Sequence, residues 1–124
     1  GYDGSLNIEK LTENFVQSLE LSGPVYLGRK FDWVLSLEVG EHIPAQFEDI
    51  FLENLNKHAD KGIILSWAVP GQYGLGHVNP RSNDYIISKM EEKGLIHDPE
   101  SQKFLRSNIG LKYFQNTLMV FRKY

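Results

Sequence analysis

The segment of residues 31–44 constrains the fold of this chain more than any other. Its first part, residues 31–37, is a nearly continuous apolar run, and two carboxylates and an imidazole follow it, namely Glu38, Glu41 and His42. Such a run predicts a strand that is buried on both faces of a parallel sheet. Because ligands of open α/β sheets bind outside the carboxyl ends of the strands, the three polar residues are candidates for a functional site.

Strand and helix patterns alternate along the rest of the chain. Pro44 suits the first turn of a helix whose apolar stripe extends to about residue 58. Gly62 then opens a second buried strand over residues 63–69. We assign Trp33 and Trp67, one from each strand, to the core.

The last third of the chain continues this alternation. Ser82 or Asn83 can cap a helix that Gly94 ends. Three elements follow: a short strand at residues 95–98, a helix at 99–107 with Phe104 and Leu105 facing inward, and a last strand at 116–122. Alternating strands and helices predict an α/β fold with a mostly parallel sheet covered on both faces. The last two strands are close enough in sequence for the final strand to be antiparallel.

The N-terminal part carries two acidic residues at expected strand ends. Residues 2–5 have the pattern of a strand that ends in a turn, and residues 7–21 predict a short helix or loop followed by a strand that ends near Glu20. Asp3 and Glu20 would then lie at the same edge of the sheet. An acidic group at such an edge can accept hydrogen bonds from ribose hydroxyls.

Composition excludes several classes of protein. The chain has 124 residues, the size of one domain at most, and its 41% hydrophobic content is sufficient for a core. A formal net charge of −3 argues against nucleic acid and membrane surfaces as partners. The chain has no cysteine, which rules out disulfides and thiolate metal sites and favours a cytoplasmic protein. No apolar run is long enough to cross a membrane.

Glu38, Glu41 and His42 allow three interpretations. Glu38 and His42 are four residues apart, so they share a face if the loop enters a helical turn. Two carboxylates and an imidazole suit Mg²⁺ or Mn²⁺, and the same residues suit a general base. Alternatively, Glu38 binds the ammonium group of a ligand while the other two residues cap the next helix.

A glycine-rich loop, residues 70–81, follows the second predicted strand and is expected on the same rim as Glu38. It lacks the pattern of a phosphate-binding loop. His77 could complete a metal site or act as a base. In the alternative interpretation, Tyr73, His77 and Asn79 only satisfy hydrogen bonds within the loop. The remaining histidines, His58 and His97, are predicted to be structural.

The sequence Asp-Trp-Val-Leu-Ser-Leu-Glu-Val-Gly-Glu-His-Ile-Pro, residues 32–44, resembles the fourth strand and following loop of class I S-adenosylmethionine (SAM)-dependent methyltransferases of the quinone-biosynthesis O-methyltransferase type. The resemblance covers nearly the whole chain. It implies a Rossmann-like three-layer sandwich with strand order 3-2-1-4-5-7-6, in which strand seven is antiparallel. It also implies SAM as the cofactor and a small-molecule methyl acceptor, with transfer to an oxygen.

Residue roles follow from the same resemblance. Asp3, with Gly4, corresponds to the residues that hold the SAM ribose, and Glu20 and Leu21 to those that contact adenine. Leu37, Glu38 and His42 correspond to the loop that closes over SAM and the acceptor. The catalytic candidates are then three residues, Glu38, His42 and His77.

The Glu-x-x-Glu-His spacing also resembles a metal-using subset, which comprises quinone-biosynthesis O-methyltransferases and small-RNA 2′-O-methyltransferases. This implies that Glu38, Glu41 and His42 bind Mg²⁺ or Mn²⁺, with His77 as a fourth ligand. The ion would lower the pKa of the acceptor hydroxyl. Without an ion, His42 or His77 would be the base.

The chain departs from the family at its beginning. Strand one and its Gly-rich loop, which hold the methionine part of SAM, have no counterpart in residues 1–124. We therefore expect these residues to be the C-terminal two-thirds of an N-terminally incomplete domain, inactive alone and weak in SAM binding. Two rival interpretations are a non-catalytic methyltransferase-like interaction module and a different nucleotide-binding α/β enzyme such as a dehydrogenase.

Overall fold

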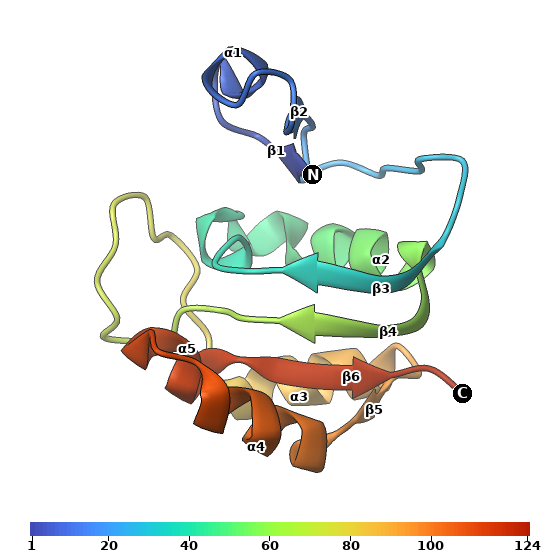
Figure 1. The fold of residues 1–124 in the computed structure, drawn as a ribbon, viewed down its shortest axis with the longest axis vertical. Helices are drawn as coiled ribbons and strands as arrows, with labels where there is room; N and C mark the ends of the chain where they lie inside the picture. Colours follow the sequence, from blue (N-terminus) through green and yellow to red (C-terminus); the bar gives the residue numbers. More distant parts are fainter.

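The computed structural model describes all residues from 1 to 124 and contains two separate sheets (Figure 1). The larger sheet has the order β3–β4–β6–β5, built from β3 (Phe31–Ser36), β4 (Ala59–Leu65), β6 (Met119–Arg122) and β5 (Ile96–His97). β3 and β4 are parallel, whereas β6 is antiparallel to both of its neighbours. This order and the direction of the last strand confirm the 4-5-7-6 half of the arrangement that the resemblance implies.

The smaller sheet is a parallel pair of two-residue strands. β1 (Tyr2–Asp3) and β2 (Gln17–Ser18) flank the short helix α1 (Ile8–Leu11), and neither strand pairs with β3. In Figure 1 the pair lies on the β3 side of the larger sheet, with no strand between. A mostly apolar hollow of about 480 Å³ lies between them. This position is where the family order would place strand one.

Helices cover the larger sheet on two sides. Two of them, α2 (Glu48–His58) and α3 (Asn83–Glu92), lie on one face, and α4 (Pro99–Asn108) and α5 (Lys112–Thr117) lie on the other beside β6 (Figure 1). Two short 3₁₀ turns, η1 (Gly40–His42) and η2 (Ala45–Phe47), connect β3 to α2. No helix of the structure has the length and apolar character needed to cross a membrane.

The core lies mainly between the larger sheet and the layer of α2 and α3. Trp67 is fully buried, as predicted, and its ring packs edge-on against Phe51 with the ring centroids 5.9 Å apart. Other fully buried side chains come from both helices and the sheet, among them Leu52, Ile63, Leu65, Ile86, Met90 and Phe121. Burial of large apolar side chains is the dominant favourable contribution to folding.

β3 is not buried on both faces, which corrects the prediction. Trp33 is 38% exposed and Leu35 is 63% exposed, because no helix covers their side of the strand. Trp33 is therefore not a core residue. Its ring instead packs over Gly62 of β4, and the guanidinium of Arg122 lies 5.3 Å from the ring centroid. Gly62 thus leaves room for an indole in mid-strand and does not begin a strand.

Several predicted boundaries were also wrong. The second strand begins at Ala59, immediately after α2, and ends at Leu65 instead of covering residues 63–69. The last strand is preceded by α5, which was not predicted, and begins at Met119. Phe104 is 68% exposed although it was expected to face inward. Adjacent residues of a helix point about 100° apart, so Phe104 cannot share the narrow inward face that the half-buried Leu105 occupies.

Helix ends followed the predicted signals more closely. Ser82 caps α3, since its Oγ accepts a hydrogen bond from Tyr85 N at 3.2 Å, and Gly94 follows the helix with φ +82°. Asp98 caps α4 by accepting from Ser101 N at 2.9 Å.

Candidate functional site

The loops after β3 and β4 leave the larger sheet at the same edge, as the sequence predicted. Gln72 Nε2 donates a 2.6 Å hydrogen bond to Glu38 Oε1, and His42 Nδ1 lies 3.0 Å from the carbonyl oxygen of Gly76. The backbone of the two loops is joined as well, because the carbonyl oxygen of Glu41 accepts from Val78 N and Asn79 N, both at 2.9 Å. The two loops therefore form one continuous rim.

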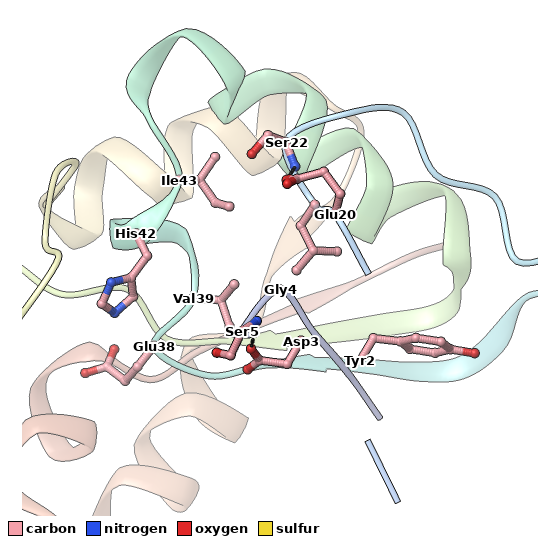
Figure 2. Close-up of a pocket in the computed structure, with 11 residues that line it drawn as sticks. Tyr2, Asp3, Gly4, Ser5, Glu20, Ser22, Glu38, Val39, His42 and Ile43 are labelled. Carbon is pink, nitrogen blue, oxygen red and sulfur yellow. Dashed lines mark hydrogen bonds between the residues drawn. The ribbon is translucent and has the colours of Figure 1, made fainter. Parts of the chain in front are cut away.

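A polar hollow of about 470 Å³ connects this rim with the smaller sheet (Figure 2). Asp3 and Gly4 line it from the end of β1, and Glu20 lines it from the segment after β2. Glu38 and His42 line it from the loop after β3, so the carboxyl ends of strands from both sheets meet here. Its other lining residues are Tyr2, Ser5, Leu21, Ser22, Val39 and Ile43.

The structure therefore brings together five of the six candidate cofactor residues. The sixth, Leu37, lines the neighbouring apolar hollow between β1 and β3 instead. Asp3 Oδ1 accepts a hydrogen bond from Ser5 N at 2.7 Å, as expected for a turn after β1. Glu20 Oε1 accepts from Ser22 N at 2.8 Å, and this backbone hydrogen bond lowers the pKa of the Glu20 carboxyl. The carboxylate of Glu20 thus remains ionised at neutral pH.

Glu38 is held from two sides. Its backbone has φ +54°, an uncommon conformation for a non-glycine residue that costs free energy unless its surroundings impose it. Ser66, just beyond β4, provides part of that constraint: Ser66 Oγ accepts from Glu38 N at 2.9 Å and donates to Glu38 Oε2 at 3.1 Å. With Gln72 on the other carboxylate oxygen, the Glu38 side chain has a fixed position at the rim.

Glu41, His42 and His77 form a separate cluster. One potential ligand atom from each residue lies within 4.8 Å of the others. Glu41 is fully buried, neither of its carboxylate oxygens has a hydrogen-bond partner, and burial raises the pKa of its carboxyl. His77 Nε2 lies 3.9 Å from Glu41 Oε1. The rings of His42 and His77 pack edge to face, with their centroids 4.9 Å apart. The arrangement suits a bound cation, or a proton shared within the cluster.

Of the alternative interpretations, the structure contradicts helix capping by Glu41 and His42 but supports hydrogen bonding by His77 and Asn79. Neither Glu41 nor His42 caps a helix, because η1, η2 and α2 begin without a side-chain cap. In the loop after β4, His77 and Asn79 do satisfy hydrogen bonds, whereas Tyr73 is completely exposed. His58 and His97 make hydrogen bonds away from the rim: His58 Nε2 accepts from Leu27 N, thirty-one residues earlier, and His97 Nε2 contacts Gln102 Oε1.

A buried carboxylate that sequence reasoning missed anchors the end of the second loop. Glu48, at the start of α2, accepts hydrogen bonds from Asn79 Nδ2 at 2.7 Å, Arg81 Nε at 2.9 Å and Tyr85 Oη at 2.6 Å. Asn79 O in turn accepts from Trp67 Nε1 at 2.7 Å. No local pattern reveals Glu48, because its partners come more than thirty residues later. Gln72 could have been found from the sequence, since it is a polar residue that follows a predicted buried strand, whereas Ser66 lay inside the predicted strand and follows β4 only in the structure.

No protein-family model matches the sequence, and no curated protein sequence matches it either. Among solved structures, the fold is similar to magnesium protoporphyrin IX methyltransferase (ChlM) from Synechocystis PCC 6803, determined with bound SAH. The TM-score is 0.60 at 18% sequence identity. The match covers 88% of this chain and 51% of the neighbour, so the chain spans about half of that protein's length. This likeness establishes the Rossmann-like fold of class I methyltransferases.

Proposed function

We propose that this protein is a SAM-dependent methyltransferase that methylates an oxygen of a small molecule. The observation that carries the proposal is the polar hollow, where Asp3 and Glu20 meet Glu38 and His42 at the carboxyl ends of strands from both sheets. The fold of the ChlM neighbour supports it, as does the resemblance of residues 32–44 to methyltransferases. The hollow offers carboxylates where the ribose and adenine of a nucleoside need hydrogen-bond acceptors.

The proposed cofactor roles follow the hollow from one sheet to the other. Asp3, supported by Gly4, would accept hydrogen bonds from the ribose hydroxyls of SAM. Glu20 and Leu21 would contact the adenine. Glu38, fixed by Ser66 and Gln72, would face the charged end of SAM, where a carboxylate favours both the sulfonium and the ammonium group.

The chemical step would transfer the methyl group from the sulfonium to an acceptor oxygen. Such a transfer depends on holding the two reactants in line and on removing the proton of the acceptor hydroxyl. His42 and His77 are the candidate bases. His42 is exposed and lines the hollow, so it can reach an acceptor directly, whereas the His77 side chain is only 12% exposed and does not line the hollow.

A divalent ion is the other way to activate the acceptor. The residues fit an ion, because the buried Glu41 carboxylate has no partner and lies beside two imidazoles. When bound, the ion would lower the pKa of the acceptor hydroxyl. Glu41, His42 and His77 would hold it, with Glu38 close by on the same rim. Mg²⁺ and Mn²⁺ were the ions suggested by the sequence pattern.

We also propose that residues 1–124 form the C-terminal two-thirds of the methyltransferase domain. Two observations support this: the hollow between β1 and β3, and the match to about half of a larger methyltransferase. The outer edge of β3 has no strand partner, and unpaired backbone groups on such an edge are suited to accept one. The cytoplasmic location remains a prediction from composition.

Calorimetric titration of the full-length protein with SAH tests the proposal. We expect saturable binding that Asp3→Asn weakens about tenfold, a loss of about 1.4 kcal/mol, because an amide is a poorer acceptor for paired ribose hydroxyls. Asn retains the turn, so the fold is preserved. Asp32→Asn is the matched control, since Asp32 is an exposed residue of β3 that pairs with Lys61. Absence of SAH binding, or equal effects of both variants, would contradict the proposal and favour a non-catalytic interaction module.

A further inference from the structure

Every hydrogen bond between residues 1–30 and the rest of the protein involves one of two side chains of α2, Asn54 or His58. No backbone pairing joins the two parts, because β1 and β2 pair only with each other. The partners of the two side chains are four backbone groups, namely Leu21 O, Gly23 O, Val25 N and Leu27 N. The hydrogen bonds that place the N-terminal part against the larger sheet therefore all depend on Asn54 and His58.

Asn54 and His58 are buried on one face of α2. They are four residues apart, which places them on the same side of the helix, and they are 4% and 6% exposed. Asn54 Oδ1 accepts from Val25 N at 2.9 Å, and Asn54 Nδ2 donates to Gly23 O at 2.7 Å. The chain around Val25 belongs to no strand, so its backbone groups have no ladder partners. The side chains of α2 supply the partners that a neighbouring strand would otherwise give.

The segment that α2 holds continues directly into one wall of the polar hollow. Ser22 lines the hollow, and its N–H donates to the carboxylate of Glu20 at 2.8 Å (Figure 2). Leu19 N donates to Asp3 O at 2.9 Å, which ties β1 to the same stretch of chain. The opposite wall, with Glu38, belongs to the larger sheet. A shift of the held segment would therefore move two acidic cofactor candidates away from the rim.

The hydrogen bonds of His58 require a neutral ring. Its Nδ1 lies 2.7 Å from Asn54 O, and because a carbonyl oxygen can only accept, Nδ1 carries a proton. Its Nε2 accepts from Leu27 N at 2.9 Å, so Nε2 carries none. A second proton on the ring would sit on Nε2 and face the N–H of Leu27, where two donors repel each other. Only the neutral imidazole can therefore hold Leu27.

No carboxylate pairs with this imidazole to favour a second proton. Tyr26 faces the ring from the N-terminal part, with the ring centroids 5.6 Å apart. Lys123, after β6, donates to two carbonyls at the same end of α2. Asp60, two residues after the histidine, is exposed, and no ion pair of the structure includes His58. Acid would therefore charge the ring without a new partner to keep it in place.

We infer that Asn54 and His58 are positioning residues for the cofactor: they hold residues 21–27, and with them the N-terminal wall of the polar hollow, against the rim as long as the imidazole is neutral. The inference rests on the proposed function for the identity of the ligand. Neither side chain lines the polar hollow, so both act on affinity through the segment that they hold. Cofactor binding is then sensitive to acid through a histidine that does not touch the cofactor.

Calorimetric titration of the full-length protein with SAH at pH 7.5 compares Asn54→Ala with Asn56→Ala. Both asparagines lie on α2, but Asn56 Nδ2 donates to Lys93 O, just after α3. We expect Asn54→Ala to weaken SAH binding about tenfold, because the wall would be in place only about one-tenth of the time. Asn56→Ala should bind SAH as the parent does. Equal affinities of the two variants would overturn the inference.

Amide hydrogen exchange measures the hold without any ligand. Exchange at Val25 should be faster in Asn54→Ala than in the parent and in Asn56→Ala, whereas exchange in α3 should be unchanged and so show that the fold is intact. An unchanged rate at Val25 would overturn the inference, because the segment would then be held by other contacts.

The pH profile of SAH affinity separates positioning by His58 from a merely structural role. In His58→Gln the amide oxygen can accept from Leu27 N but does not titrate. We expect the affinity of the parent to fall about tenfold between pH 7.5 and pH 5.5, and that of His58→Gln to fall less than about threefold. His42 titrates in both proteins and so does not affect the comparison. His97→Gln, on β5, is the control and should keep the profile of the parent.

The outcomes separate this inference from the proposed function. If the parent binds SAH and His58→Gln follows the same pH profile as the parent, the inference is rejected and the proposed function stands. If the parent does not bind SAH at either pH, the proposed function is rejected, and the cofactor role of the two side chains is rejected with it.

Discussion

Gly40 lies directly against the indole ring of Trp67. A Cβ atom at residue 40 would overlap the six-membered part of that ring, so only glycine fits here. Gly40 begins the 3₁₀ turn after β3, and Trp67 follows β4 and is fully buried. The contact sets how closely the two rim loops approach, and with it the distance between Glu38 and the loop that carries His77.

The substitution Gly40→Ala should therefore destabilise the protein by about 2 kcal/mol or more, in the upper range for overpacking a core. Gly110→Ala is the matched control, because a Cβ there meets no atom within 4 Å and its φ is not in the left-handed region. Urea unfolding followed by circular dichroism measures both. Similar midpoints for the two variants would show that the loops do not depend on this contact.

Glu41→Gln should stabilise the metal-free protein at neutral pH. Burial raises the pKa of Glu41 above its usual 4.5, so the folded state holds this proton more tightly than the unfolded chain does. The free energy of unfolding therefore falls as the pH rises through the unfolded-state pKa, until the folded carboxyl has also ionised. At pH 7.5 the variant should gain on the order of 1 kcal/mol, and the difference should shrink near pH 4.5.

Thermal unfolding in the presence of EDTA at both pH values measures this difference. Glu53→Gln serves as the control, since the Glu53 side chain is 55% exposed. If the Glu41→Gln variant unfolds at a lower temperature than the parent at pH 7.5, the ionised carboxylate has a stabilising partner.

Loss of the Glu48 carboxylate should loosen the C-terminal end of the loop after β4, where Asn79 and Arg81 bind it. Burial alone would raise the pKa of Glu48, but hydrogen bonds from Tyr85, Asn79 and Arg81 outweigh it and lower the pKa. Removing one member of such a buried network costs about 3 kcal/mol. We expect Glu48→Ala to lose this much in urea unfolding, whereas Asp49→Ala, one residue later and exposed, should lose little. Equal losses would place the anchor of the loop elsewhere.

Asp98 should make the stability of the protein sensitive to acid. Its carboxylate accepts hydrogen bonds from Ser101 N and from Arg122, and these hold its pKa well below the usual range. Its stabilising contribution is complete above the unfolded-state pKa and is lost as the pH falls toward the folded-state pKa.

Asp98→Asn keeps an oxygen that can cap α4 but loses the charge. Its melting temperature should be lower than that of the parent at pH 7 and should change less between pH 5 and pH 3. Asp98→Ala, which loses the cap as well, should unfold at a still lower temperature. Identical acid profiles for Asp98→Asn and the parent would assign the acid sensitivity to another carboxyl.

The order of the larger sheet was predictable only through the resemblance of residues 32–44 to a known family, whereas the shared rim was predictable from local patterns. Apolar runs that end at polar residues located both rim loops, and Ser82 and Gly94 located α3. The exposure of Trp33 and Leu35 was not predictable, because it depends on which face of β3 the helices cover. Gly62 looked like a break, although its role is to accommodate the ring of Trp33. Local pattern cannot separate these two uses of glycine.

The site shows the same division. Spacing along the chain grouped Glu38 with Glu41 and His42, but the positive φ of Glu38 turns that residue toward Ser66 and Gln72. The partner that completes the cluster, His77, comes from the next loop. Tertiary hydrogen bonds decide which of several nearby acidic residues remains without a partner. The spacing of residues along the sequence does not reveal these hydrogen bonds.

The most direct test of the account is the mapping of SAH binding by NMR on the ¹⁵N-labelled protein. The account predicts that the amide resonances of Asp3, Gly4, Glu20 and Glu38 shift together with one saturation curve, while those of α4 remain in place. Shifts confined to other surfaces, or no shifts at saturating SAH, would contradict the claim that the hollow between the two sheets is a cofactor site.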